Sequence, residues 1–104
     1  MEEIKISRKL LREVGVKSAY LLSYLIYEYD DAYENGGLTE DGYLYCSVDY
    51  LQDKLKLSDY QQRRILNQLK SLGLLDYKSV GFAPKRYIKL FENEIISFLT
   101  EHPV

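Results

Sequence analysis

The sequence predicts one mainly helical α+β domain, with three core helices and a β-hairpin that joins a small antiparallel sheet. Two patterns support this prediction. Apolar residues recur at helical spacing in three segments, whereas residues 74–91 alternate apolar and polar around a Gly-Phe-Ala-Pro turn. A length of 104 residues suits a single domain with one modest core, so we assign residues 1–104 to it.

The composition excludes several classes of protein. Cys46 is the one cysteine, so the chain has neither an internal disulfide framework nor a multi-cysteine metal site. No apolar run approaches the roughly 18 residues of a transmembrane helix, and residues 1–15 lack the pattern of a signal peptide. We therefore expect a cytoplasmic protein without membrane contact. Its unusual feature is a content of 11 tyrosines with no tryptophan.

Two helices are expected in the N-terminal third. The spacing of apolar residues in 3–14 predicts a short extended piece at Ile4 and Ile6, followed by a helical turn that ends at Gly15. The next helix, about 16–33, is apolar almost all round, which is typical of a helix buried on more than one side. We expect its second side to be covered either by the N-terminal segment or by another subunit of a homodimer. The core stripe is Ala19, Leu22, Ile26, Tyr29 and Tyr33, and the candidate dimer stripe is Tyr20, Tyr24 and Tyr27.

The middle of the chain predicts a loop, a strand and two capped helices. Residues 30–41 are acidic and contain Asn-Gly-Gly, which indicates an exposed loop before a strand at 43–46. Ser47 is expected to cap a helix over 48–56, and Ser58 to cap a second helix that stops at Gly73. Two helices joined by a short turn make a helix-turn-helix, here about 47–72.

The second helix of this pair has two distinct faces. One side is apolar and Gln62 points toward it, so we treat Gln62 as structural. The opposite face has long hydrogen-bonding side chains, a net positive charge and no acid after the cap, as a helix in a DNA groove requires. The apolar side is Ile65, Leu66, Leu69 and Leu72; the polar face is Tyr60, Arg63, Arg64, Asn67 and Ser71, with Gln61 and Gln68 on a shoulder.

Residues 74–91 predict a β-hairpin, which we expect to form a three-stranded sheet with the strand at 43–46. Alternation places Lys85, Tyr87 and Lys89 on one face of the returning strand and Arg86 on the other. Phe82, at the tip, is expected to fold back onto the core, and contact with a partner is the alternative. A short amphipathic helix, about 92–100, follows, with Ile95, Ile96, Phe98 and Leu99 as its apolar residues.

Charge is segregated along the chain. Residues 58–91 hold seven Lys/Arg against two acids, a net charge of +5, whereas the remainder holds seven basic and fourteen acidic residues, a net charge of −7. The whole chain is therefore slightly acidic, at −2, but its basic part coincides with the second helix and the hairpin. Chance clustering of surface charge is the alternative explanation.

The order helix, strand, helix, helix, hairpin resembles the winged helix-turn-helix superfamily, most specifically at 72–75, Leu-Gly-Leu-Leu, before the hairpin. A narrower likeness covers residues 4–90. It resembles the N-terminal domains of plasmid and phage replication initiators, the replication initiator protein A family, which is related to DnaD-type primosomal domains. This likeness implies binding of double-stranded DNA at an origin, often as a dimer; a phage or bacterial transcription regulator is the alternative role. The stretches that carry it are Lys17 to Leu22, Glu40 to Tyr45, Gln61 to Leu75 and Pro84 to Ile88.

Candidate DNA contacts lie on the second helix and the hairpin. Arg63 and Arg64 are suited to guanine O6 and N7 or to phosphates, and a good base contact contributes about 1–3 kcal/mol of discrimination. Capping is the stronger expectation for Ser58, and alternation turns Arg86 away from Lys85. The second hypothesis is a winged-helix module that binds proteins through its tyrosine helix and acidic loop without reading DNA. The predicted DNA-binding set is Ser58, Tyr60, Gln61, Arg63, Arg64, Asn67, Gln68, Lys78, Lys85 and Arg86.

No catalytic, metal or cofactor site is predicted. The one histidine, His102, lies near the C-terminus, so a Ser-His or Cys-His site has no suitable base. Asp30, Asp31 and Glu34 lack the spacing of a calcium loop, and we expect a solvated acidic loop there. Cys46 is expected to be a small buried apolar residue. We therefore predict that the protein is not an enzyme.

Overall fold

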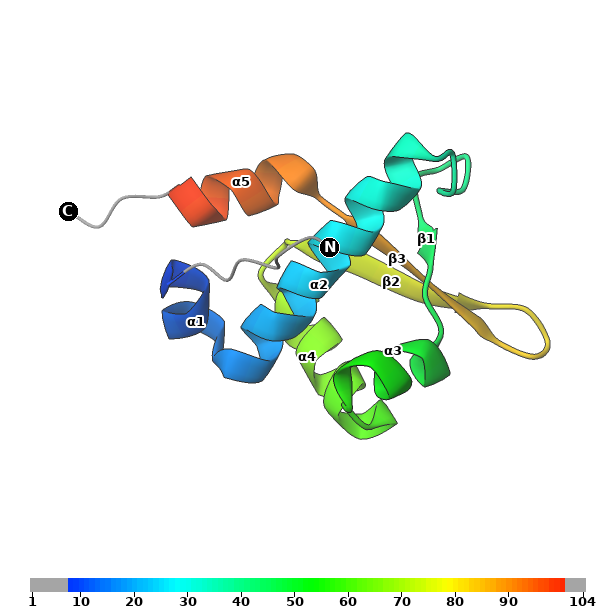
Figure 1. Cartoon of the computed structure of the whole chain (residues 1–104), viewed down its shortest axis with the longest axis horizontal. Coiled ribbons are helices and arrows are strands. Elements are labelled where there is room, and N and C mark those ends of the chain that lie inside the picture. The colour runs from blue at the N-terminus through cyan, green and yellow to red at the C-terminus, as the bar shows by residue number, and fades with distance from the viewer. Residues whose placement is uncertain (1–7, 101–104) are drawn as a thin grey trace.

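The computed structural model of the chain describes residues 8–100. This part is mainly helical with one small three-stranded antiparallel sheet, which confirms the predicted α+β class (Figure 1). In chain order the elements are α1 (Arg8–Val14), α2 (Val16–Glu34), β1 (Leu44–Tyr45), α3 (Val48–Leu55), α4 (Asp59–Ser71), β2 (Leu75–Val80), β3 (Lys85–Leu90) and α5 (Glu92–Thr100).

The longest helix, α2, passes in front of the sheet in Figure 1. It starts directly after Gly15, whose φ of 91° lets the chain turn sharply between α1 and α2. The predicted helix is confirmed, but the acidic loop begins later than expected, because residues 30–34 continue the helix as far as Asn35. Neither α2 nor any other described helix is long and apolar enough to cross a membrane. The extended piece predicted at Ile4 and Ile6 lies outside the described residues.

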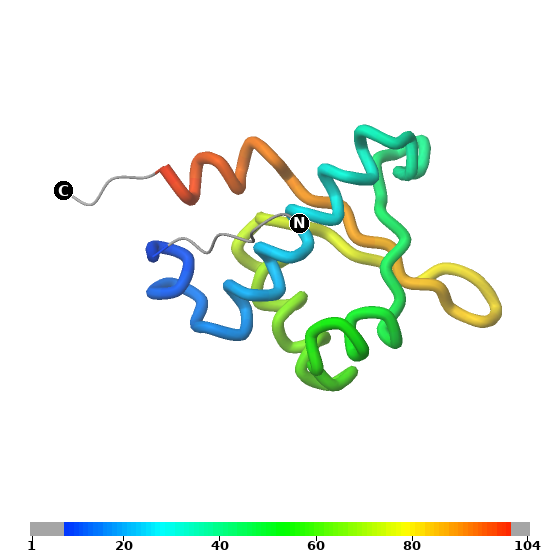
Figure 2. Tube along the Cα trace, in the orientation of Figure 1, coloured from blue at the N-terminus to red at the C-terminus, as the bar shows by residue number. Residues whose placement is uncertain are grey.

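The sheet has the strand order β1-β3-β2, so the returning strand of the hairpin lies in its centre. Tyr45 pairs with Tyr87, and Val80 pairs with Lys85, which leaves residues 81–84 as the turn of the hairpin. Figure 2 shows this turn at one end of the molecule and α5 at the other. The predicted three-stranded sheet is confirmed, although β1 covers two residues and not four.

Serine caps begin α3 and α4, as predicted. Ser47 Oγ accepts a hydrogen bond of 3.1 Å from a backbone N–H of α3. Ser58 Oγ accepts one of 3.1 Å from the Gln61 N–H, and the Gln61 side chain accepts one of 2.9 Å from the Ser58 N–H, a complete capping box. A left-handed Lys56 ends α3, and Gly73, at φ 78°, follows the end of α4. These local signals fix the lengths of both helices.

One core joins the helices to a single face of the sheet. Its centre includes Leu22, Leu51, Leu66 and Ile88, all with no exposed surface. Side chains alternate between the two faces of a strand. The buried residues of β3 point toward the helices, so Lys85, Tyr87 and Lys89 point to the opposite face of the sheet. The sheet therefore has an inner face against the helices and an outer face toward solvent.

Three predicted core contacts are wrong. Tyr33 is 74% exposed, because it lies in the last turn of α2, one turn beyond Tyr29, which still packs against the core. Leu72 is 46% exposed because it follows the last residue of α4. Phe82 is fully exposed, because the strand register holds the turn away from the body of the molecule. In α5, Ile95 is buried whereas Ile96 is exposed.

Candidate nucleic-acid interface

The outward face of α4 is polar and cationic. Tyr60, Arg63, Arg64 and Asn67 are all exposed on it, as predicted. Arg63 Nε pairs with Asp59 at 3.3 Å, but both side chains are more than half exposed, so this pair holds Arg63 weakly. Arg64 lies 5.9 Å from the centroid of the Tyr60 ring, and it has no ion pair within residues 8–100. The face therefore offers two guanidinium groups to an anionic ligand.

A groove of about 570 Å³ lies between α4 and the hairpin. Arg63 lines its α4 side, and Pro84 and Lys85 line its hairpin side. Asp49 and Asp59 also line the groove, near the starts of α3 and α4. A polyanion in this groove would thus be attracted mainly at its two rims, where Arg63 and Lys85 lie.

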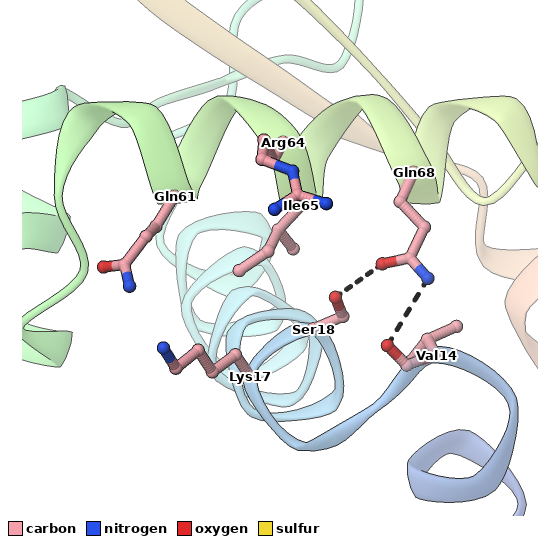
Figure 3. A pocket seen from close by; sticks show the side chains of 7 residues that line it. All are labelled: Val14, Lys17, Ser18, Gln61, Arg64, Ile65 and Gln68. Atoms are coloured by element: carbon pink, nitrogen blue, oxygen red, sulfur yellow. Dashed lines mark hydrogen bonds between the residues drawn. The ribbon is translucent and has the colours of Figure 1, made fainter.

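Three of the predicted DNA contacts have structural roles. Ser58 and Gln61 form the capping box of α4, which confirms the capping role expected for Ser58. The Gln68 amide oxygen accepts a hydrogen bond from the Ser18 hydroxyl, and its nitrogen donates to the Val14 carbonyl at 3.4 Å (Figure 3). Gln68 therefore ties α4 to the start of α2. Gln61 and Gln68 are thus engaged within the chain, and both also line the cleft beside α4, so their predicted DNA contacts stay predictions.

Arg86 differs most from its prediction, because its side chain is buried and not exposed on the hairpin. Its Nε donates to the Cys46 carbonyl at 2.9 Å, and its Nη2 donates to the Ser47 carbonyl at 3.3 Å and to Gln62 Oε1 at 2.8 Å. Gln62 has no exposed surface and donates to the Leu57 carbonyl at 2.8 Å, which agrees with its predicted structural role. Arg86 thus joins β3 to the starts of α3 and α4; it lines the groove beside α4, but only 5% of its surface is exposed there.

Lys78 and Lys85, the other two predicted DNA contacts in the hairpin, lie on the outer face of the sheet. Lys85, at the start of β3, also reaches the rim of the groove. Lys78 pairs with Asp41 at 3.4 Å and lies 4.2 Å from the centroid of the Tyr43 ring, so it is not beside α4. A hydrogen bond from the Thr39 hydroxyl, together with the contact to Lys78, lowers the pKa of the Asp41 carboxyl.

A cleft of about 470 Å³ lies between α4 and the start of α2, as Figure 3 shows from close by. Arg64 and Gln61 line it from α4, and Lys17 lines it from the first turn of α2. Two cations from distant parts of the sequence therefore meet at one cleft. The sequence does not predict Lys17 as a contact. The one local feature that singles it out is its place in the first turn of a helix, where the helix dipole disfavours a cation.

The tyrosine stripe of α2 is partly used within the chain. The Tyr24 hydroxyl shares a hydrogen bond of 3.2 Å with Tyr50 of α3, and the Tyr50 hydroxyl donates to Glu28 Oε2 at 2.8 Å. Burial, reinforced by these hydrogen bonds, raises the pKa of Tyr24. Tyr20 and Tyr27 remain 38% and 39% exposed. Part of the second side of α2 is therefore covered by α3, an arrangement that the sequence did not predict. Of the three tyrosines in the stripe, Tyr20 and Tyr27 stay exposed.

The remaining chemically reactive groups lie apart from this interface. Cys46 is buried, as predicted, and burial raises the pKa of its thiol. Within residues 8–100, no three His, Cys, Asp or Glu side chains form a group that could hold a metal ion. The acids expected in a loop, Asp30, Asp31 and Glu34, lie on the last turns of α2. His102 is outside the described residues.

The candidate interface thus consists of the outward face of α4 together with the groove and the cleft on either side of it. Protein-family models, curated proteins and solved structures offer no match for the chain. Its function must therefore be argued from the chemistry of this interface.

Proposed function

We propose that the chain is a winged helix-turn-helix domain that binds double-stranded DNA. In this arrangement α3 and α4 form the helix-turn-helix, the β2–β3 hairpin is the wing, and α4 enters the major groove. The observation that supports this best is the groove between α4 and the hairpin, with Arg63 on one rim and Lys85 on the other. A helix about 10–12 Å wide fits the major groove, and such a pair of cations would then lie near the flanking phosphates.

The exposed residues divide between base reading and phosphate binding. Arg63, Arg64 and Asn67 lie on the outward face of α4, where side chains reach base edges. Asn67 Oδ1 accepts a hydrogen bond from the Tyr77 hydroxyl, so the side-chain NH2 group is the part of Asn67 that can donate to a base. Lys85 and the cleft lined by Lys17 and Arg64 are suited to phosphates on the two sides of α4.

The proposal is tested by the affinity of the whole chain for duplex DNA as a function of salt. We expect binding at low salt that weakens as salt rises, because phosphate contacts release counterions. Arg63→Ala/Arg64→Ala should lower the affinity at least about tenfold. Arg8→Ala/Arg12→Ala removes the same charge from the exposed side of α1 and should have a much smaller effect. Absence of wild-type binding, or binding that does not respond to salt, would refute the proposal.

The biological role that we propose is that of a plasmid- or phage-type replication initiator or a DNA-binding regulator. The resemblance of residues 4–90 to initiator N-terminal domains supports this role. A homodimer through Tyr20 and Tyr27 would present two copies of α4 to two half-sites of a palindrome. Binding-site selection from random duplex DNA gives the preferred sequence, and a palindromic result would agree with a dimer.

A second candidate is a module that assembles proteins without reading DNA. It is favoured by the neutralisation of three cations of the basic segment, since Arg63 pairs with Asp59, Lys70 with Asp76 and Lys78 with Asp41. The exposed Tyr20 and Tyr27 would then be the partner surface. Sedimentation of the wild type and of Tyr20→Ser/Tyr27→Ser tests this surface, because only the wild type should self-associate.

A further inference from the structure

The outer face of the sheet carries tyrosines and lysines in alternation. Strand pairing sets Tyr45 beside Tyr87 on one side and Lys78 beside Tyr87 on the other. Lys85 and Lys89 flank Tyr87 along β3, because alternate residues of a strand share a face. Together with a tyrosine that precedes β1, they form what we call the tyrosine–lysine face: Tyr43, Tyr45, Lys78, Lys85, Tyr87 and Lys89.

The rings and cations of this face are already in contact with one another. The Tyr45 and Tyr87 centroids are 5.6 Å apart, with their planes inclined at 54°. Lys85 Nζ lies 5.9 Å from the Tyr45 centroid, and Lys89 Nζ lies 5.7 Å from that of Tyr43. Each lysine therefore places a charge beside a ring, on a surface built from neighbouring strands.

This face is open to solvent. The helices pack against the inner face, where Ile88 and Leu90 are buried. On the outer face Tyr45 keeps 51% of its surface exposed, and Tyr87 and Lys89 are only half-buried. An exposed ring of this size contributes little to the core, so the core does not explain why tyrosines occupy these positions.

The acids at the border of this face are already engaged. Asp76 accepts a hydrogen bond of 2.7 Å from the Tyr43 hydroxyl and pairs with Lys70 at 3.2 Å. Asp41, at the other acidic position, pairs with Lys78. Within residues 8–100 neither Lys85 nor Lys89 has an ion pair. The lysines available to a ligand are therefore those that flank Tyr87.

We propose that the tyrosine–lysine face binds single-stranded nucleic acid, with bases stacked on Tyr45 and Tyr87 and phosphates held by Lys85 and Lys89. Every base has a π-face, so stacking on exposed rings needs no particular sequence, and aromatic residues on the strands of a sheet hold single-stranded bases in this way. A duplex does not suit this face, because its bases are stacked on each other. An acidic peptide would satisfy the lysines but leave the rings without a partner.

This second site extends the proposed function and does not depend on it. The duplex interface lies on α4, whereas the bases of a single strand would contact the opposite side of the hairpin sheet. Lys85 and Tyr45 border both surfaces, whereas Tyr87 and Lys89 belong to the tyrosine–lysine face and do not line the groove. The two activities can therefore be separated by mutation, and a protein that holds both a duplex and an unpaired strand suits a site where DNA is opened.

The experiment measures the fluorescence anisotropy of labelled oligothymidylate and oligouridylate, each about 20 nucleotides long, at low salt. We expect binding that weakens as salt rises, and the tighter of the two identifies DNA or RNA as the preferred strand. An abasic deoxyribose-phosphate chain of the same length should bind at least about tenfold more weakly, because it keeps the charge and lacks the bases.

Matched variants locate the site. Tyr45→Ala should weaken single-strand binding about tenfold, whereas Tyr45→Phe, which keeps the ring, should stay within about twofold of the wild type. Tyr60→Ala removes a ring from α4 that is more exposed than Tyr45, 63% against 51%, and should leave single-strand binding unchanged. Thermal melting by circular dichroism checks that each variant is folded.

Three results would overturn the assignment of this face. They are a wild type that does not bind single strands, an abasic chain that binds as tightly as oligothymidylate, and a loss with Tyr60→Ala as large as with Tyr45→Ala. Because the duplex test relies on Arg63 and Arg64, either proposal can fail while the other stands.

Discussion

A single buried guanidinium joins the sheet to both helices of the predicted helix-turn-helix. Arg86 donates to two carbonyls at the start of α3 and to Gln62 of α4, all of them neutral acceptors. A cation without a carboxylate beside it is stabilised only by such dipoles, so the removal of either side of this network leaves buried polar groups unpaired. Arg86 is therefore expected to determine stability and not to bind a ligand.

Arg86→Met tests this role. It should lower the free energy of unfolding by about 3 kcal/mol, because Gln62 Oε1 and the Cys46 carbonyl lose their Arg86 donor, whereas the Ser47 carbonyl keeps the hydrogen bond from the Leu51 N–H. Urea denaturation gives the value. Lys85→Met, on the exposed side of the same strand, is the matched control and should stay within about 0.5 kcal/mol of the wild type. Equal losses for the two variants would contradict the buried network.

The thiol of Cys46 should be unreactive in the folded protein. It is 3% exposed, and burial raises its pKa, so both access and the thiolate fraction are low. We expect a disulfide reagent to modify it at least about a hundredfold more slowly in buffer than in denaturant. Tyr45→Cys in a Cys46→Ser background, which moves the thiol to the outer face of the sheet, should react quickly in buffer. A fast reaction of the native thiol would show that β1 opens readily.

At the scale of elements, local signals predicted most of the fold. Helix caps, glycine stops and strand alternation act within a few residues, so the limits of α3, α4 and the hairpin could be predicted from neighbouring residues. Contacts between elements could not be predicted in this way. The role of Gln68 in joining α4 to α2 has no local signal, because its partner Ser18 lies 50 residues away in sequence. The exposure of Phe82 has none either, because an apolar residue gives no sign of how far a turn projects.

The capping box of α4 offers a test at the same scale. Ser58→Ala should lower the free energy of unfolding by about 1 kcal/mol, because the Gln61 N–H loses its acceptor. Ser71→Ala removes a hydroxyl that bonds to a carbonyl at the other end of the helix and should cost less. Chemical denaturation compares the two. If Ser58→Ala had no effect, the start of α4 would be held by tertiary packing alone.

In the whole molecule, acidic side chains lie beside several of the cations that the sequence gathers in residues 58–91 and partly neutralise them. Asp41, from the acidic part of the chain, pairs with Lys78 of the basic segment, and Asp76 pairs with Lys70 within that segment. Arg64 and Lys85 have no such partner within residues 8–100. Duplex binding should therefore depend on a few cations, so Arg64→Ala is expected to reduce the slope of log affinity against log salt by about one.

The ion pairs of the sheet also make stability depend on pH. The hydrogen bond from the Tyr43 hydroxyl, followed by the contact with Lys70, lowers the pKa of Asp76 in the folded state. A carboxyl whose folded pKa lies below its unfolded value stabilises the protein above the unfolded pKa, near about 4, and this contribution is lost as the pH falls through the folded pKa. Asp41, whose pKa is also lowered, acts in the same direction.

Asp76→Asn should therefore reduce the acid sensitivity of the fold. Its free energy of unfolding should be lower than that of the wild type at about pH 7, by less than about 1 kcal/mol because the carboxylate is partly solvated, and the two should converge toward about pH 3. Urea denaturation at both pH values measures this difference. Glu40→Gln, at an exposed acid in the loop before β1, is the control and should leave a curve parallel to the wild type. If Asp76→Asn were also parallel, the hydrogen bond from Tyr43 would not favour the ionised carboxylate, and the border of the tyrosine–lysine face would be less ordered than its geometry indicates.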